Sequence, residues 1–199
     1  MQIGHRKIGP NEKPLVIAEI GINHGGDLAV AKNMVELAAR SGCECIKHQT
    51  HFVEDEMTEA AKQIFPPNAD VSIWEVMASC ALAREDEIAL KNYTEDLGLI
   101  YLSTPFSRAA SDFLEEIGVP GFKIGSGEAD NLPPIRHIAQ KGKPVILSTG
   151  MQPIQTTRQC VQILADTGVE YSLFDCTSLY PSPQAVVPLR YVRGLYETV

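Results

Sequence analysis

The sequence predicts an α/β fold built on parallel strands, and two observations predict it. Amphipathic, helix-like segments each end on a glycine that leads within a residue or two into a short apolar run. These glycines are Gly42, Gly98, Gly118, Gly142 and Gly168. A glycine suits the left-handed backbone that commonly follows the last turn of a helix. Near-continuously apolar strands that alternate with helices are typical of a parallel sheet covered by helices.

Six apolar runs are the predicted strands, and they cover residues 15–20, 43–46, 99–102, 119–124, 143–147 and 169–174. The helices between them are amphipathic. In the first, Leu28, Ala31, Val35 and Ala38 follow the spacing of one buried face. Ser107 is a suitable N-cap for a helix over 108–117. Further helices are predicted over 72–82, 84–97 and 154–167.

The connection between the second and third strands is unusually long. Residues 48–70 carry the charged run Glu54-Asp55-Glu56 and the pair Pro66-Pro67, and they are predicted to form a loop. A loop of this length in a compact domain is usually functional, often as a lid or flap. The alternative is a solvated surface excursion.

Composition limits the classes of partner. The chain has 199 residues, of which 44% are hydrophobic, so it can bury a sizeable core. Its net charge is −8, which argues against binding to nucleic acid or to an anionic membrane. No apolar run reaches membrane-spanning length. Five cysteines, an odd number at irregular spacing, predict reduced thiols and a cytoplasmic location.

Polar side chains gather at the carboxyl ends of the predicted strands, where parallel α/β folds bind their ligands. They are Glu19, Asn23, His24, Lys47, His48, Gln49, Ser103, Thr104, Lys123, Ser126, Glu128, Ser148, Thr149, Asp175, Thr177, Ser178 and Tyr180. Any one of them could be an ordinary polar group of a loop. Because all six strand ends agree, the sequence predicts an active site there.

One stretch, residues 119–128, combines several of these features. Its glycines would let backbone N–H groups approach an anion, while Lys123 adds a positive charge and Ser126 a hydroxyl. Glu128 cannot favour an anion, so its predicted task is to handle a proton or a water molecule. Gly-Ser-Gly is also common in ordinary loops, and both interpretations stand at this point.

Six motifs in order carry a resemblance to a known family. They lie at residues 18–26 (AEIGINHGG), 47–51 (KHQTH), 103–107 (STPFS), 123–128 (KIGSGE), 147–151 (LSTGM) and 176–181 (CTSLYP). Together they resemble the N-acetylneuraminate (sialic acid) synthase family, which includes the legionaminate synthases. The resemblance runs from about residue 8 to about residue 183.

The resemblance implies a TIM-type (β/α)₈ barrel that condenses phosphoenolpyruvate with an N-acyl hexosamine aldehyde. The products would be a sialic-type nonulosonic acid and phosphate, and a divalent metal (Mn²⁺ or Mg²⁺) would polarise the aldehyde. With about six of eight strands visible, residues 1–199 are expected to be an incomplete synthase barrel. The family's metal-binding histidines and its small antifreeze-like domain are expected beyond Val199.

The resemblance also implies roles for matching residues. The phosphoenolpyruvate contacts would be Lys47, Thr104, Lys123, Ser126, Ser148 and Ser178. The sugar contacts would be Glu19, Gln49 and Tyr180, and the catalytic residues Lys47, Lys123 and Glu128. No metal ligand is expected within the chain, where His51 is predicted to lie at the surface and His48 outside direct ligation. Asp175 and Ser178 depart from the residues most common in the family at these positions.

Three alternatives are compatible with these motifs. One is another synthase that condenses phosphoenolpyruvate with an aldose, although the motifs supply no arginine-rich site for a phosphorylated sugar. A second is an aldolase with Lys47 or Lys123 as a Schiff-base nucleophile. A third is an inactive chain that binds phosphoenolpyruvate or completes its barrel with another polypeptide. Because open sheet edges promote association, a homo-oligomer or a barrel-completing partner is expected.

Overall fold

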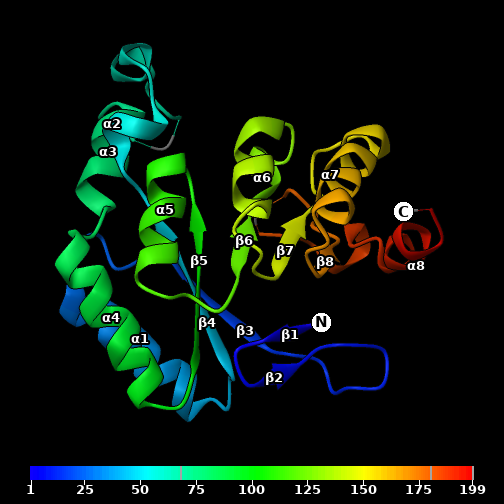
Figure 1. Ribbon diagram of the computed structural model, residues 1–199. Coiled ribbons are helices and arrows are strands. Elements are labelled where there is room, and N and C mark those ends of the chain that lie inside the picture. The colour runs from blue at the N-terminus through cyan, green and yellow to red at the C-terminus, as the bar shows by residue number, and fades with distance from the viewer. Residues whose placement is uncertain (68, 180, 199) are drawn as a thin grey trace. The chain divides into compact units, whose positions relative to one another are not determined.

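A computed structural model describes residues 1–67, 69–179 and 181–198 (Figure 1). The chain divides into two compact units. The N-terminal unit is Ile8–Pro120, and the C-terminal unit joins Met1–Lys7 to Gly121–Val199. Each unit contains a three-stranded sheet whose strands are all parallel. The prediction of an α/β fold with parallel strands is therefore confirmed.

The sheet of the N-terminal unit has the strand order β3 (Ile17–Gly21), β4 (Cys45–Thr50) and β5 (Ile100–Pro105). Within it, Lys47 lies opposite Glu19, and Gln49 lies opposite Thr104. Residues opposite one another share a face of a sheet, and successive residues alternate between faces. These four side chains therefore belong to one face, whereas His48 belongs to the other.

Helices pack against this sheet. Helix α1 (Leu28–Arg40) contacts β3, and α4 (Arg84–Asp96) contacts both α1 and β5 (Figure 1). Helix α5 (Arg108–Glu116) also contacts β5, and it begins as predicted, because the Ser107 hydroxyl accepts the N–H of Ala110. The fully buried side chains of the unit include Ile46, Leu90, Tyr101 and Leu114.

The prediction of a loop over residues 48–70 is wrong for much of its length. Strand β4 continues to Thr50 and is followed by the short helices α2 (Val53–Glu56) and η1 (Glu59–Gln63). Helix α3 (Ile73–Cys80) then begins at a capping box formed by Ser72 and Glu75. The guanidinium of Arg84 lies 4.1 Å from the ring centroid of Phe52 and 4.9 Å from that of Phe113. This stacking holds the start of the segment in place.

In the C-terminal unit the strand order is β6 (Phe122–Ile124), β7 (Val145–Ser148) and β8 (Tyr171–Phe174). Its helices are α6 (Leu132–Ala139), α7 (Ile154–Thr167) and α8 (Leu189–Thr198), with short turns at η2 (Ser126–Glu128) and η3 (Gln184–Val186). Helices α6 and α7 pack side by side (Figure 1). A hairpin of β1 (Gln2–Ile3) and β2 (Arg6–Lys7), which the sequence did not predict, belongs to this unit.

Every predicted strand overlaps a strand of the structure. The five glycines predicted to end helices all have positive φ, between 68° and 79°. An alanine there would clash with the neighbouring carbonyl oxygen, which explains why glycine marks these junctions. Closure of an eight-stranded barrel stays a prediction. Within the described ranges, no helix is both long and apolar enough to span a bilayer.

Candidate active site

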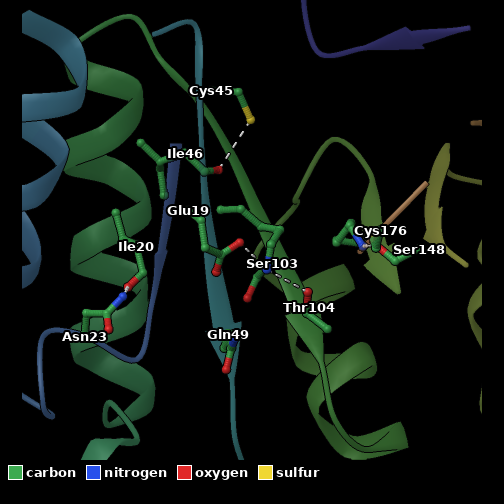
Figure 2. Close-up of polar contacts among 12 residues, drawn as sticks. Glu19, Ile20, Asn23, Cys45, Ile46, Gln49, Ser103, Thr104, Ser148 and Cys176 are labelled. Atoms are coloured by element: carbon green, nitrogen blue, oxygen red, sulfur yellow. Dashed lines mark hydrogen bonds and ion pairs between the residues drawn. The ribbon is translucent and has the colours of Figure 1, made fainter. Parts of the chain in front are cut away.

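The first polar cluster lies on one face of the β3–β4–β5 sheet and centres on Lys47. Its ammonium nitrogen is 2.7 Å from Glu19 Oε2 and 3.2 Å from Thr104 Oγ1. Each of the three strands therefore supplies one member (Figure 2). The Lys47 side chain is 12% exposed, so its positive charge acts where water screens it poorly.

A small space beside this cluster is lined by polar atoms. The point where a side chain at Gly21 would begin lies 3.1 Å from Glu19 Oε1, 3.5 Å from Gln49 Nε2 and 3.8 Å from Asn23 Nδ2. Gly21 has a φ of +52°, a conformation that favours glycine, and the missing side chain leaves the space open. Glu19 and Gln49, predicted to contact the sugar, thus each have an atom within 3.5 Å of the same point.

The second polar cluster belongs to the C-terminal unit and centres on Lys123. This lysine is only 4% exposed, and its ammonium group donates to the Ile124 carbonyl at 2.7 Å and to the Ser148 hydroxyl. The thiol of Cys176 lies 3.3 Å from the same hydroxyl (Figure 2). Lys123 and Ser148, two predicted phosphoenolpyruvate contacts, are therefore in direct contact.

The other two predicted contacts of this unit meet at Gly150. A Cβ atom there would lie 2.9 Å from Ser126 Oγ and 2.7 Å from both Ser178 Oγ and the Cys176 carbonyl. Since Cys176 also contacts Ser148, one residue connects the two groups of hydroxyls. The arrangement is a set of hydroxyl donors beside a buried ammonium, which is suited to phosphate or carboxylate oxygens.

Two predicted site residues, Glu128 and Tyr180, belong to neither polar cluster as described above. Glu128 lies half-buried in η2, the same short turn as Ser126. Tyr180 lies outside the residues that the structure describes. Their predicted roles, on the reacting carbon and on the sugar respectively, stay predictions.

A buried polar network that sequence reasoning missed lies on the opposite face of the β3–β4–β5 sheet. His48 Nε2 is 3.1 Å from His24 Nε2, and His48 Nδ1 is 3.1 Å from the Tyr101 hydroxyl. That hydroxyl donates to Glu87 Oε1 at 2.9 Å. All four side chains are at most 3% exposed.

Glu87 anchors this network to helix α4. Its Oε1 atom also accepts the Thr50 hydroxyl at 2.5 Å, and Thr50 Oγ1 is 2.7 Å from Ser103 Oγ. Burial and the nearby Glu87 carboxylate raise the pKa of Tyr101 well above its usual value, so Tyr101 stays protonated. Burial and His48 lower the pKa of His24. One signal could have revealed Glu87: it shares helical spacing with the buried Leu90 and Thr94.

The prediction that His51 lies at the surface is wrong. Its side chain is 3% exposed, its ring stacks on Phe106 with centroids 4.3 Å apart, and it contacts Glu56 and Gln49. Helix α2 carries Glu56, whose carboxylate lies within hydrogen-bond distance of His51 Nδ1. Among the described side chains, no group of three His, Cys, Asp or Glu residues could hold a metal ion.

Comparison with known proteins decides the family. The NeuB family model matches residues 34–199. The chain belongs to the NeuB family. The resemblance to N-acetylneuraminate and legionaminate synthases that the six motifs predict is thereby confirmed.

Two of the relatives that match the chain are synthases. Human N-acetylneuraminate-9-phosphate synthase is 33% identical over 192 residues, which is 94% of this chain and 53% of the human protein. N,N'-diacetyllegionaminic acid synthase of Campylobacter jejuni is 34% identical over 191 residues, 92% of this chain and 57% of that protein. The chain spans about half the length of the curated relatives it matches.

The solved structure of a sialic acid synthetase matches the fold of this chain. The N-acetylneuraminic acid synthetase of Leptospira borgpetersenii, in complex with citrate, superposes with a TM-score of 0.88 at 28% identity. The match covers 100% of this chain and 66% of that chain. The mixed α/β fold with parallel strands is therefore similar to that of a sialic acid synthetase over the matched part.

Proposed function

We propose that this chain belongs to an enzyme that condenses phosphoenolpyruvate with an N-acyl hexosamine aldehyde of the N-acetylmannosamine type. The products are a nonulosonic acid and phosphate. NeuB membership supports the general synthase function. The observation that carries the substrate assignment is the contact of each of two lysines with a hydroxyl, Lys47 with Thr104 and Lys123 with Ser148.

These lysines suit an anionic substrate. Phosphoenolpyruvate carries a phosphate and a carboxylate, and hydrogen bonds from ammonium groups to such oxygens are about twice as strong as neutral ones. The hydroxyls of Ser126 and Ser178 at Gly150 add donors beside Lys123. The chain is acidic overall, with a net charge of −8, and Lys47 is paired with Glu19, so the proposed attraction of an anion depends most on the buried ammonium group of Lys123.

The polar space at Gly21 supports the proposed sugar contacts. Glu19 offers a carboxylate oxygen and Gln49 an amide nitrogen to it, a combination that pairs with hydroxyl groups, which both donate and accept. Tyr180 is included in the proposal as a third sugar contact.

The proposed reaction forms one carbon–carbon bond. Carbon 3 of the enol attacks the aldehyde carbon, whose oxygen gains a proton. Water adds at carbon 2, and phosphate leaves as the C–O bond breaks. Lys123 in the C-terminal unit and Lys47 in the N-terminal unit are each proposed as contacts to the anionic groups. Glu128 takes a proton that the water loses as it adds to carbon 2.

No step is assigned to a metal here, because the described residues contain no group that could hold one. Mn²⁺ or Mg²⁺, bound by histidines beyond Val199, stays part of the proposal for the whole enzyme. So do closure of a (β/α)₈ barrel, an antifreeze-like domain, a cytoplasmic location, and a homo-oligomer or barrel-completing partner. Within this proposal, the 199 residues bind phosphoenolpyruvate but do not complete the reaction without the remaining length of their relatives.

Isothermal titration with phosphoenolpyruvate tests the proposal. The chain should bind it, Lys123→Met should lose at least about tenfold in affinity, and Lys62→Met should bind as the wild type does. Lys62 is a matched control because it is an exposed lysine that pairs with Glu59. Absence of binding to the wild-type chain, or equal binding by Lys123→Met, contradicts the proposal. Borohydride trapping with pyruvate should label no lysine.

A further inference from the structure

We propose that the buried pair of His51 and Glu56 determines sugar specificity by orienting the side-chain amide of Gln49. The pair turns this amide so that its NH₂ group, and not its carbonyl, faces the polar space at Gly21. The inference rests on the proposed function, in which Gln49 contacts the sugar. It assigns His51 and Glu56 as positioning residues, which act through Gln49 without touching the ligand.

The contacts of His51 fix both of its ring nitrogens. Nδ1 lies 2.9 Å from Glu56 Oε2 and 3.0 Å from Glu56 Oε1, and Nε2 lies 3.1 Å from Gln49 Oε1. The side chains of His51 and Glu56 are 3% and 4% exposed. Stacking on Phe106, with ring planes 16° apart, prevents the imidazole from turning away.

The chemistry of the partners determines where the protons are. An ionised carboxylate and an amide oxygen only accept hydrogen bonds, so each ring nitrogen of His51 must donate one. A ring that donates from both nitrogens carries a positive charge, which the Glu56 carboxylate balances in this buried position. If Nε2 lost its proton it would accept instead, and the Gln49 amide would turn its NH₂ toward His51. The carbonyl would then face Gly21.

The surroundings of Gly21 favour the same orientation independently. Gln49 Nε2 and Glu19 Oε1 lie 3.5 Å and 3.1 Å from one point, the Cβ position of Gly21. An NH₂ group beside a carboxylate is attracted to it, whereas a carbonyl in its place would be repelled. The space therefore offers one acceptor, from Glu19, and one donor, from Gln49. It selects a ligand group that both donates and accepts, namely a sugar hydroxyl.

Nuclear magnetic resonance of the free ¹⁵N-labelled chain tests the orientation without any ligand. The expected result is that both nitrogens of His51 show the shifts of protonated nitrogen. A correlation across the hydrogen bond should connect Nε2–H to the side-chain carbonyl of Gln49. A His51 ring with an unprotonated Nε2 that accepts from the Gln49 NH₂ group overturns the proposal.

Binding of N-acetylmannosamine and phosphoenolpyruvate to Glu56→Gln tests the consequence. We expect N-acetylmannosamine affinity to fall about tenfold, because one well-aligned hydrogen bond is lost. Phosphoenolpyruvate affinity should not change. Glu59→Gln is the matched control, since Glu59 is an exposed glutamate in the same segment. Unchanged sugar affinity in a folded Glu56→Gln chain overturns the proposal.

A second variant, Gly21→Ala, tests the proposal in case Glu56→Gln does not fold. Gly21→Ala would place a methyl group between Glu19 and Gln49 and should abolish sugar binding while leaving the His51 signals unchanged. Gly25→Ala carries the same backbone strain, with φ +59°, but meets no atom within 4 Å. Equal sugar binding by these two variants contradicts the assignment of the space. A wild-type chain that binds no N-acetylmannosamine contradicts the proposed function, while the resonance data still decide the orientation of Gln49.

Discussion

The Nε2 atoms of His24 and His48 lie 3.1 Å apart in the interior of the N-terminal unit. His24 Nδ1 accepts the N–H of Gly26, so neutral His24 carries its proton on Nε2 and donates it to His48. His48 then keeps its own proton on Nδ1, toward the Tyr101 hydroxyl, which in turn donates to Glu87. A second proton on either ring would break one of these bonds. The chain of bonds therefore requires both histidines to be neutral.

Stability should fall in mild acid because of His24. Burial and His48 lower the pKa of His24 below its ordinary value of 6.5. Between the lowered and the ordinary pKa the unfolded chain binds more protons, so the free energy of unfolding decreases as pH falls through this window. We expect the free energy of unfolding to be lower at about pH 5.5 than at about pH 7.5. Denaturant titrations at both pH values measure it.

Replacement of His24, with His5 as a control, distinguishes this effect from general acid destabilisation. His24→Asn should have a lower free energy of unfolding than the wild type at neutral pH. This free energy should fall less on acidification than it does in the wild type. His5→Asn, at an exposed histidine, should leave the pH dependence unchanged. An equal loss on acidification in His24→Asn and the wild type would show that another group is responsible.

Tyr101→Phe should destabilise the chain by about 1–3 kcal/mol. The change removes a donor from the fully buried Glu87 carboxylate and a partner from His48 Nδ1. Tyr93→Phe is the comparison, because the Tyr93 hydroxyl also donates to a glutamate, Glu36, but at a site that is only half-buried. Its effect should be much smaller. Comparable losses in the two variants, measured by thermal and denaturant unfolding, would contradict the importance assigned to burial.

Gly150→Ala should weaken phosphoenolpyruvate binding and cost about 1–3 kcal/mol of stability. The added methyl group would lie 2.7 Å from the Cys176 carbonyl and would push apart the hydroxyls of Ser126 and Ser178. Gly127→Ala, in the turn after β6, meets no atom within 4 Å and should bind normally. Titration calorimetry and melting temperatures of both variants give the comparison. Normal phosphoenolpyruvate binding by Gly150→Ala would show that the Ser126 and Ser178 hydroxyls do not belong to the proposed site.

Met151→Gly should be neutral or stabilising by up to about 1 kcal/mol, unlike most substitutions by glycine. Met151 has a φ of 63°, a conformation that costs about 1–2 kcal/mol for a residue with a side chain. The side chain is 70% exposed, so little burial is lost. Met57→Gly gives a comparison, since Met57 has extended backbone with φ −121° and should be destabilised. A clear drop in melting temperature for Met151→Gly would contradict the relief of strain.

Local signals in the sequence predicted the elements well. The glycines at the helix ends and the apolar runs after them located five of the six strands, because backbone conformation at these junctions depends on the residue itself. The Lys123–Ser148 contact was also foreseeable, since both residues lie at or next to the carboxyl ends of neighbouring parallel strands. The β1–β2 hairpin was not, because its strands have two residues each and carry no alternating pattern.

The polar interior was harder to predict. Glu87 stands in the run Arg84-Glu85-Asp86-Glu87, which is typical of a solvent-exposed first helical turn. Its burial depends on Tyr101 and Thr50, partners from two distant strands. His51 was assigned to the surface because the helix that carries Glu56 was not foreseen. Such contacts are set by tertiary packing and leave little trace in local periodicity.

The segment between β4 and β5, which contains α3, packs closely against Gly26, just before the start of α1. A Cβ atom at Gly26 would lie 2.5 Å from the Ser79 carbonyl oxygen, near the end of α3. Two segments some fifty positions apart therefore cannot evolve separately: any side chain gained at position 26 demands a compensating shift of the α3 terminus. Descendants of this sequence that lengthen or shorten the segment between β4 and β5 should change position 26 together with it, whereas those that preserve the segment should keep glycine there.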